Sequence, residues 1–361
     1  MLSNLLRRLR GPLLVLFALV ALDLAVLATA RTWDRHSPDD YAARVETCRQ
    51  RRPDAVFVGG SVVSEGIVPR EIVGANWQGE PLASAYALGL PGGTTSEFFH
   101  AVKAACQPPP RLLVYGITAS DLNDSRHEPH GPASLMTFGD AVEWAKTRPD
   151  SRAWVLRQYA LARASRVSSL WQYRHGIRMW AALQFDESTE SAREAKELRR
   201  YSDALRGEDG YAPAAGFVEQ RYDHVKATNG TLPPFAFLNK YKTGSHRTYL
   251  HKLICWAGDN AVSLVLVDMP VTEDLEKQYP EAFAEYRKLL AEEEAAHGLL
   301  VIRAHRDIVG ITDAGFADTI HLNGVGATVL SRWLKAKLDE IGRPATLDDN
   351  RVRAQAGGDR P

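Results

Sequence analysis

One serine and a distant Asp-x-x-His pair are the residues of this chain whose types could do chemistry together. Ser61 follows the apolar run DAVFVGG (54–60), while Asp318 and His321 stand in FADTIHLNGVG (316–326). A serine hydroxyl becomes a nucleophile when a histidine takes its proton and a carboxylate orients that histidine. The three residues therefore predict acyl transfer through a covalent intermediate. The alternative for Ser61 is a helix N-cap in a tight strand-to-helix turn.

A second Asp-x-x-His pair, Asp124 and His127, shows that the spacing alone is not specific. Location separates the two pairs. Asp318 and His321 lie between the last predicted strand and the last predicted helix, so they reach the same edge of the sheet as Ser61. Asp124 and His127 follow the third predicted strand, where no strand or cap signal fixes their geometry. We therefore favour Asp318 and His321 as the partners of Ser61.

The elements that must position these residues follow a strand–helix alternation. Apolar runs predict five strands buried on both faces, as in a parallel sheet, at residues 54–60, 81–90, 111–117, 261–270 and 298–304. Helices are predicted within 94–110, which a threonine caps and three prolines end, and within 272–298 and 323–342. This alternation predicts a doubly wound α/β sheet.

Other segments flank or interrupt the predicted α/β domain, which spans residues 54–342. Residues 31–53 are expected to form a linker with a helix, and residues 125–244 a helical insertion rich in tryptophan and arginine. The aromatic residues of the insertion are expected to be core. The acidic run 292–294 is expected to be a solvated helix face, and the tail 343–361 to be disordered.

The N-terminus predicts export. Residues 1–11 carry three arginines, and the nineteen residues Pro12–Ala30 are apolar except for Asp23. Such a helix is about 28 Å long, close to the thickness of the hydrocarbon core. The arginines favour a cytoplasmic N-terminus with the rest of the chain outside, periplasmic or extracellular. A retained signal anchor is favoured over a signal peptide cleaved after Ala30. Asp23 either pairs with a partner helix or is merely tolerated.

Composition excludes several classes. Lys plus Arg and Asp plus Glu are equal at 44 each, so nothing points to nucleic acid. The three cysteines have no paired spacing, so no zinc site is expected, and a single disulfide of undetermined pairing stays open. The stretch GLPGG (89–93) is neither a P-loop nor a dinucleotide fingerprint, and HEPH (127–130) is favoured as a surface loop. We expect no metal and no cofactor.

From Asp54 to Ile341 the chain resembles the SGNH (GDSL-like) hydrolase superfamily, with the helical insertion as an addition. The resemblance rests on the serine after the first strand and the Asp-x-x-His block before the last helix. It implies a flavodoxin-like three-layer sandwich with a mainly parallel five-stranded sheet, and a catalytic set of Ser61, His321 and Asp318. Gly60 stands where the family often has aspartate.

Two further blocks bear on the oxyanion hole. ALGLPGGTT (87–95) resembles the family's second block, which implies the backbone N–H groups of Ser61 and Gly92 as oxyanion donors. In YGITASDLND (115–124) Gly116 fits the third block, but no asparagine stands in register. Candidates for the third donor are Thr118, Ser120 and Asn123.

An exported, N-terminally anchored domain of this type is similar to the alginate O-acetylation and lipoteichoic-acid D-alanylation proteins. This implies an esterase or O-acyltransferase that acts on acyl esters of an extracellular or cell-envelope polysaccharide, beside a membrane-bound O-acyltransferase. Asp23 would suit such a partner helix. The alternative is a catalytically weak SGNH-like module that binds glycan or assembles an export complex.

Overall fold

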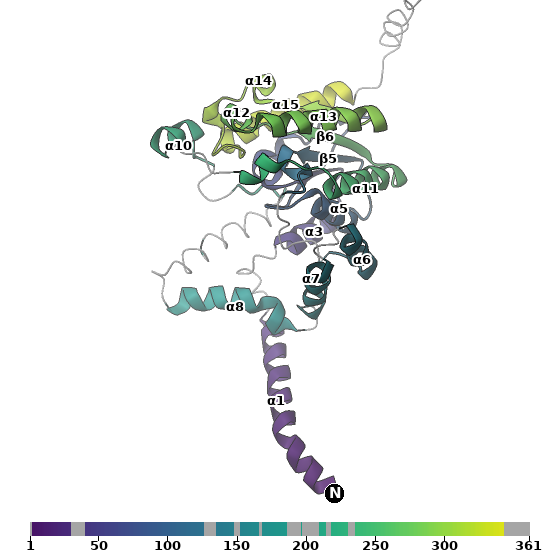
Figure 1. Ribbon diagram of the computed structural model, residues 1–361, viewed down its shortest axis with the longest axis vertical. Helices are drawn as coiled ribbons and strands as arrows, with labels where there is room; N and C mark the ends of the chain where they lie inside the picture. The colour runs from purple at the N-terminus through teal and green to yellow at the C-terminus, as the bar shows by residue number, and fades with distance from the viewer. Residues whose placement is uncertain are drawn as a thin grey trace, which may run out of the picture.

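In the computed structural model, a five-stranded parallel sheet forms the centre of an α/β body from which the N-terminal helix projects (Figure 1). Its strands are β1 (Ala55–Gly59), β4 (Ala85–Gly89), β5 (Leu112–Ile117), β6 (Ser263–Asp268) and β7 (Leu300–Arg303), in the spatial order β4-β1-β5-β6-β7. All neighbouring strands are parallel. The predicted α/β class with a parallel sheet of five strands is confirmed. In this doubly wound sheet the strand order reverses beside β1. The carboxyl end of β1 is therefore the place where such folds bind ligands.

The structure describes residues 2–29, 40–125, 135–147, 152–165, 168–185, 196, 209–213, 218–229 and 235–342. The predicted tail 343–361 and the HEPH stretch 127–130 lie outside these ranges. So do residues 31–39 of the predicted linker and parts of the predicted insertion 125–244.

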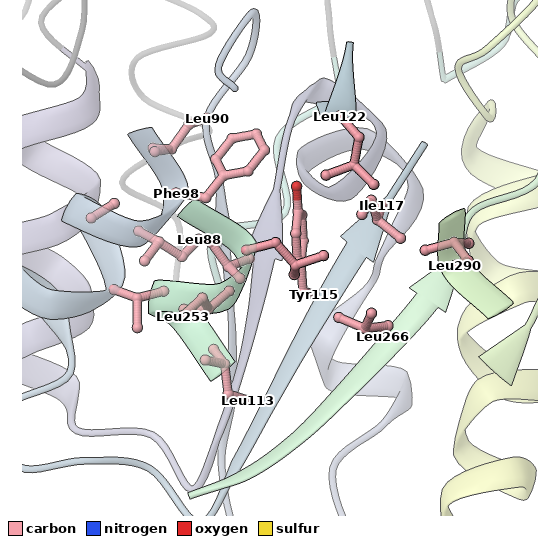
Figure 2. Close-up of a cluster of buried hydrophobic side chains, with 14 of the residues drawn as sticks. Leu88, Leu90, Phe98, Leu113, Tyr115, Ile117, Leu122, Leu253, Leu266 and Leu290 are labelled. Carbon is pink, nitrogen blue, oxygen red and sulfur yellow. The ribbon is translucent and has the colours of Figure 1, made fainter. Parts of the chain in front are cut away.

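Helices cover both faces of the sheet, because the strand side chains alternate between two hydrophobic clusters. One face packs against α3 (Asp40–Arg51), α5 (Thr95–Ala105), α11 (Ser245–Asp259) and α13 (Pro280–His297). The other packs against α4 (Ser61–Gly66), α14 (Arg306–Val309) and α15 (Gly324–Ile341). Figure 2 shows side chains of the first cluster, among them Leu88, Leu113 and Tyr115, which are fully buried. Each buried leucine contributes about 1.5–3 kcal/mol.

Two helices, α5 and α15, begin at polar residues that cap them. Thr94 and Glu97 form a capping box at the start of α5, in which the Thr94 N–H donates to Glu97 Oε2 at 2.7 Å. The side-chain oxygen of Asn323 accepts the N–H groups of Val325 and Gly326 at the start of α15. The charged segment before β7 forms α12 (Glu273–Gln278) and α13, as predicted. Short elements that the pattern did not predict are η1 (Pro69–Glu71), the antiparallel pair β2 (Asn76–Trp77) and β3 (Glu80–Pro81), η2 (Ala119–Leu122) and η6 (Asp313–Gly315).

Most of the described residues between β5 and β6 are helical. This segment carries α6 (Phe138–Thr147), α7 (Arg152–Ser165), α8 (Ser169–Phe185), α10 (Tyr222–Asn229) and η5 (Ala236–Lys240) ahead of α11. Trp144 is buried in a small cluster with Met136 and Tyr249, in line with the expectation of a core role. Trp171 is instead 44% exposed, so that expectation is wrong for this residue.

The N-terminal helix α1 (Leu2–Ala28) projects away from the α/β body (Figure 1). Among the described residues it is the one helix long and apolar enough to cross a membrane. Its apolar window, Gly11–Ala28, has a mean hydropathy of 2.4 and is only 6% buried. The window nearly coincides with the span predicted from the sequence.

The structure corrects the prediction for one acidic residue, Glu293, and answers the open question of cysteine pairing for Cys48 and Cys106. Glu293 is fully buried, so the prediction of a solvated acidic face is wrong at that position: its Oε1 accepts Arg247 Nε at 2.6 Å. The pairing of cysteines was open, and the structure places Cys48 of α3 and Cys106 at the end of α5 together as free, buried thiols. The hydrogen bond between the Cys106 and Cys48 thiols and the burial of Cys106 both raise the pKa of the Cys106 thiol.

Candidate active site

Ser61, His321 and Asp318 form one hydrogen-bonded chain, although Ser61 and His321 are separated by 260 positions. Ser61 Oγ lies 2.7 Å from His321 Nε2, and His321 Nδ1 lies 2.7 Å from Asp318 Oδ2. With Asp318 ionised, Nδ1 carries the imidazole proton and Nε2 accepts the hydroxyl proton of Ser61. This is the arrangement in which a histidine can remove a serine proton.

The loop before α15 holds the acid and the base in place. Asp318 Oδ1 accepts the N–H groups of Ile320 and His321, each at 2.8 Å, so the carboxylate is tied to its own loop. The Ala317 N–H donates to the His321 carbonyl at 2.8 Å and closes the loop. The Asp-x-x-His spacing therefore places one carboxylate oxygen on the backbone and the other on the imidazole.

The electrostatics of the pair favour an ionised Asp318 beside a basic His321. Burial opposes charge on both groups, but their mutual hydrogen bond outweighs it. With the added help of backbone N–H donors, the pKa of Asp318 is lowered below its usual 3.8. The hydrogen bond to Asp318 and the nearby Glu65 charge raise the pKa of His321 above its usual 6.5. A raised pKa makes the neutral imidazole a stronger base.

Three glycines in one row let α4 sit directly on the strand ends and present Ser61. Gly59 of β1 is in register with Gly89 of β4 on one side and with Gly116 of β5 on the other. A Cβ at Gly89 would lie 2.5 Å from the backbone nitrogen of Ser64, and one at Gly116 would lie 2.5 Å from Val63 Cγ2. Any side chain in this row would displace the helix that begins at Ser61.

Gly89→Ala is accordingly expected to destabilise the protein by about 2–3 kcal/mol, because the added methyl meets backbone rather than a flexible side chain. Urea unfolding of the full chain measures this difference. The matched control is Gly258→Ala on α11, where an added Cβ meets nothing within 4 Å. That substitution is expected to stabilise by about 0.5–1 kcal/mol through helix propensity. Equal effects of the two substitutions would contradict the packing argument.

Glu65 belongs to the site, and the sequence reasoning missed it. It lies one helical turn after Ser61, is 4% exposed, and its Oε2 has no hydrogen-bond partner in the part of the chain that the structure describes. Burial raises the pKa of Glu65 from 4.5 to about 7, with the charge of His321 acting against the rise and that of Asp318 adding to it. The available signal was its spacing, since residues four apart on a helix share a face.

Glu65→Gln is expected to change two pH dependences. The folded pKa of about 7 exceeds the unfolded 4.5, so the native state holds a proton that the unfolded state has released. Wild-type stability is therefore lost as the pH rises from 4.5 to 7, by up to about 3 kcal/mol, and the variant avoids this loss. The acid limb of catalysis should also move to lower pH, because the Glu65 charge raises the pKa of His321. Urea unfolding at pH 4 and pH 8 and a pH–rate profile measure the two effects; parallel curves for both proteins would refute them.

The two backbone oxyanion candidates lie at the ends of neighbouring strands. Ser61 is the first residue of α4, whose first N–H groups have no partner within the helix. Gly92 lies in the turn after β4, with φ +74, and the Gly93 N–H closes that turn onto the Leu90 carbonyl at 2.8 Å. A Cβ at Gly92 would meet nothing within 4 Å, so its positive φ, and not crowding, is what favours glycine there.

The three candidates for the third donor have different surroundings. Thr118 and Ser120 lie just beyond β5, with their hydroxyl oxygens 2.7 Å apart. Asp121 accepts the Thr118 N–H at 2.8 Å in a capping box for η2. Asn123 is fully buried, and its Nδ2 donates to the Phe237 carbonyl at 2.9 Å while its Oδ1 accepts the Lys242 N–H. Asn123 thus joins η2 to the segment around η5.

The competing Asp-x-x-His pair has another use for its carboxylate. Asp124 Oδ2 accepts the Ser245 N–H at 2.7 Å, and its Oδ1 accepts the His246 N–H at 3.0 Å. Asp124 therefore satisfies free N–H groups at the start of α11. His127 lies outside the described residues.

Outside the Ser61 site, one group of side chains among the described residues has the ligand types for a metal ion. The ligand atoms of His251, Glu293 and His297, on α11 and α13, lie within 4.8 Å of one another. Glu293 Oε2 already contacts His251 Nε2 at 2.8 Å, and Arg247 pairs with its other oxygen. The arginine neutralises the buried carboxylate, which favours an ion-pair network over metal binding.

The chain matches no protein-family model, and a search of curated proteins gives no match. What the fold and the site define directly is a class: an α/β protein with a Ser–His–Asp hydrogen-bonded chain at the carboxyl edge of a parallel sheet.

Proposed function

We propose that this chain is a serine esterase or O-acyltransferase of the SGNH type. The observation that carries the proposal is the continuous chain of 2.7 Å contacts from Ser61 through His321 to Asp318. Two further features of the site support the proposal. The nucleophile lies beside the switch point of the sheet, and the acid is anchored by backbone N–H groups.

The reaction proceeds in two acyl transfers. Ser61 Oγ attacks the acyl carbonyl while its proton passes to His321 Nε2, and the oxyanion forms beside the N–H groups of Ser61 and Gly92. The tetrahedral intermediate collapses when His321 gives that proton to the leaving alcohol, which leaves an ester on Ser61. Water or a sugar hydroxyl then attacks this ester, with His321 again as base. Asp318 holds the imidazole tautomer and stabilises the imidazolium in both steps.

The proposed setting is the outer side of a membrane, with α1 as a single-pass anchor. The apolar window Gly11–Ala28 and the arginines before it support this placement. By resemblance to anchored SGNH proteins, the substrate class is an acyl ester of a cell-envelope polysaccharide, and the partner is a membrane-bound O-acyltransferase.

Labelling with a serine-directed fluorophosphonate tests the proposal. The wild-type protein should be labelled, and Ser61→Ala should lose the label completely. Ser64→Ala is the matched control, because Ser64 lies on the same short helix with its hydroxyl on the Ser61 carbonyl at 3.1 Å. Retained label in Ser61→Ala would refute Ser61 as the nucleophile, and no label in folded wild-type protein would refute a serine-enzyme function.

A catalytically weak module that binds glycan or assembles an export complex is the second candidate. It is favoured by Asn123, whose amide donates to the Phe237 carbonyl, and by the glycine at position 60 where the family often has aspartate. An absence of Ser61-dependent labelling, together with glycan binding by the folded chain, would support it.

A further inference from the structure

The helices α7 and α8 lie in the most one-sidedly charged segment of the chain. Between residues 151 and 185 the sequence has six arginines and no aspartate or glutamate, whereas the whole chain has 44 basic and 44 acidic residues. The same segment holds three tryptophans and two tyrosines. Arginine and amphipathic aromatic rings are typical of helices that lie in a membrane interface.

α8 is attached directly to the apolar helix α1. Asp23 Oδ1 accepts the Ser168 hydroxyl and the Leu170 N–H, both at 2.8 Å, and so caps the first turn of α8. α8 runs across the end of α1 rather than alongside it (Figure 1). The costly acid of the apolar span therefore has a partner in the same chain.

The position of Asp23 sets the depth of α8. Asp23 is five residues before Ala28, the end of the apolar window. At the rise of an α-helix this is about 7.5 Å inside the end of the window. Interfacial helices bury their apolar face about 5–10 Å into the boundary between headgroups and acyl chains. The capped end of α8 thus lies at the depth that an interfacial helix takes.

The exposed side chains of both helices suit that depth. On α8, Trp171 is 44% exposed, the Arg174 guanidinium stacks over its ring at 4.5 Å, and Arg178 is exposed one turn later. On α7, Leu156 is 42% exposed and stands beside the exposed Arg157. The arginine guanidinium groups can bind phosphate oxygens of the lipid headgroups, while the aromatic and aliphatic side chains enter the boundary between headgroups and acyl chains.

We propose that α7 and α8 lie in the interface of the bilayer that α1 crosses, with their arginines bound to anionic lipid headgroups. The inference rests on the proposed placement of α1 across a membrane. This placement would fix the height of the Ser61 domain above the lipid. Asp23 joins α1 to α8, and α7 contacts α6, which packs against α11 of the α/β domain.

Spin labels on the full chain, in bilayer nanodiscs of phosphatidylcholine with phosphatidylglycerol, test the proposed depth. Cysteine is introduced at Leu16 of α1, at exposed Gln172 of α8 or at exposed Lys288 of α13, in a Cys255→Ser background. The Leu16→Cys label should collide with oxygen, and the Lys288→Cys label with a water-soluble nickel chelate. The Gln172→Cys label is expected at headgroup depth, with a large loss of nickel-chelate collisions relative to Lys288→Cys.

The charge is tested by Arg157→Gln, Arg174→Gln and Arg178→Gln together, against the matched control Lys277→Gln, Lys288→Gln and Arg332→Gln. Hydrogen exchange in α8 should slow when phosphatidylglycerol is added to phosphatidylcholine. The arginine variant should lose this slowing, and the control should keep it.

Two results would overturn the inference and are distinct from each other. In the first, the Leu16→Cys label is in lipid but the Gln172→Cys label collides with the nickel chelate as often as the Lys288→Cys label does. That result would mean that α8 faces a protein or polysaccharide. A Leu16→Cys label in water would refute the membrane anchor itself. Fluorophosphonate labelling of Ser61 in the same samples reports on the active site independently of both results.

Discussion

Ser61→Ala and His321→Ala are each expected to reduce acyl transfer by about 10⁶-fold, and the double variant by no more than either one. The reason is the shared proton: without His321 Nε2 at 2.7 Å the hydroxyl is not activated, and without the hydroxyl the base has nothing to activate. The two side chains act as a unit, so their effects should not add.

Hydrolysis of a p-nitrophenyl ester by the full chain measures this effect, with burst kinetics to detect the acyl-enzyme. The Ser64→Ala variant again serves as the control for changes to the same helix. Additive losses in the double variant would show that the two side chains do not share one proton transfer. A fully active His321→Ala variant would exclude His321 as the base.

Asp318→Asn is expected to lower the rate by about 10⁴-fold with little change in the fold. An asparagine oxygen can still accept the Ile320 and His321 N–H groups, so the loop should keep its shape. The amide nitrogen, however, would face His321 Nδ1 and donate to it, which moves the imidazole proton to Nε2. That tautomer cannot accept the Ser61 proton, and the loss of the carboxylate also lowers the pKa of His321.

Asp124→Asn provides the comparison, because Asp124 belongs to the other Asp-x-x-His pair of the chain. It should reduce stability through a weaker cap on α11 while leaving the rate near that of wild type. Rates are measured with the same ester, and stability by urea unfolding. Equal rate losses in the two variants would remove the distinction between the two pairs.

Much of the fold could be predicted because its signals are local. The five strands are continuous apolar runs, since a parallel strand under two helical layers is buried on both faces. The capping box of Thr94 and Glu97 and the asparagine cap of α15 mark helix starts within four residues of sequence. Glu293 escaped prediction because its burial depends on Arg247 and His251, which come from another helix.

The candidate site divides in the same way. Ser61, Asp318 and His321 were predicted together because parallel strands and their following loops converge on one edge of the sheet. The role of Asn123 could not be predicted, because its partners Phe237 and Lys242 lie more than a hundred residues away.

By itself the sequence determined the α/β alternation, the apolar N-terminal span and the residue types of a Ser–His–Asp set. Each of these features can be recognised from residues that lie close together in the sequence. Only the tertiary structure showed that Ser61 Oγ lies 2.7 Å from His321 Nε2, that Glu65 is buried one turn after Ser61, and that Asp23 of α1 caps α8. Hydrogen bonding and desolvation act through space, so a carboxylate's function depends on the donors that the fold brings to it. Asp318, Asp124 and Asp23 are the same residue type, yet one orients an imidazole and the other two hold the starts of helices.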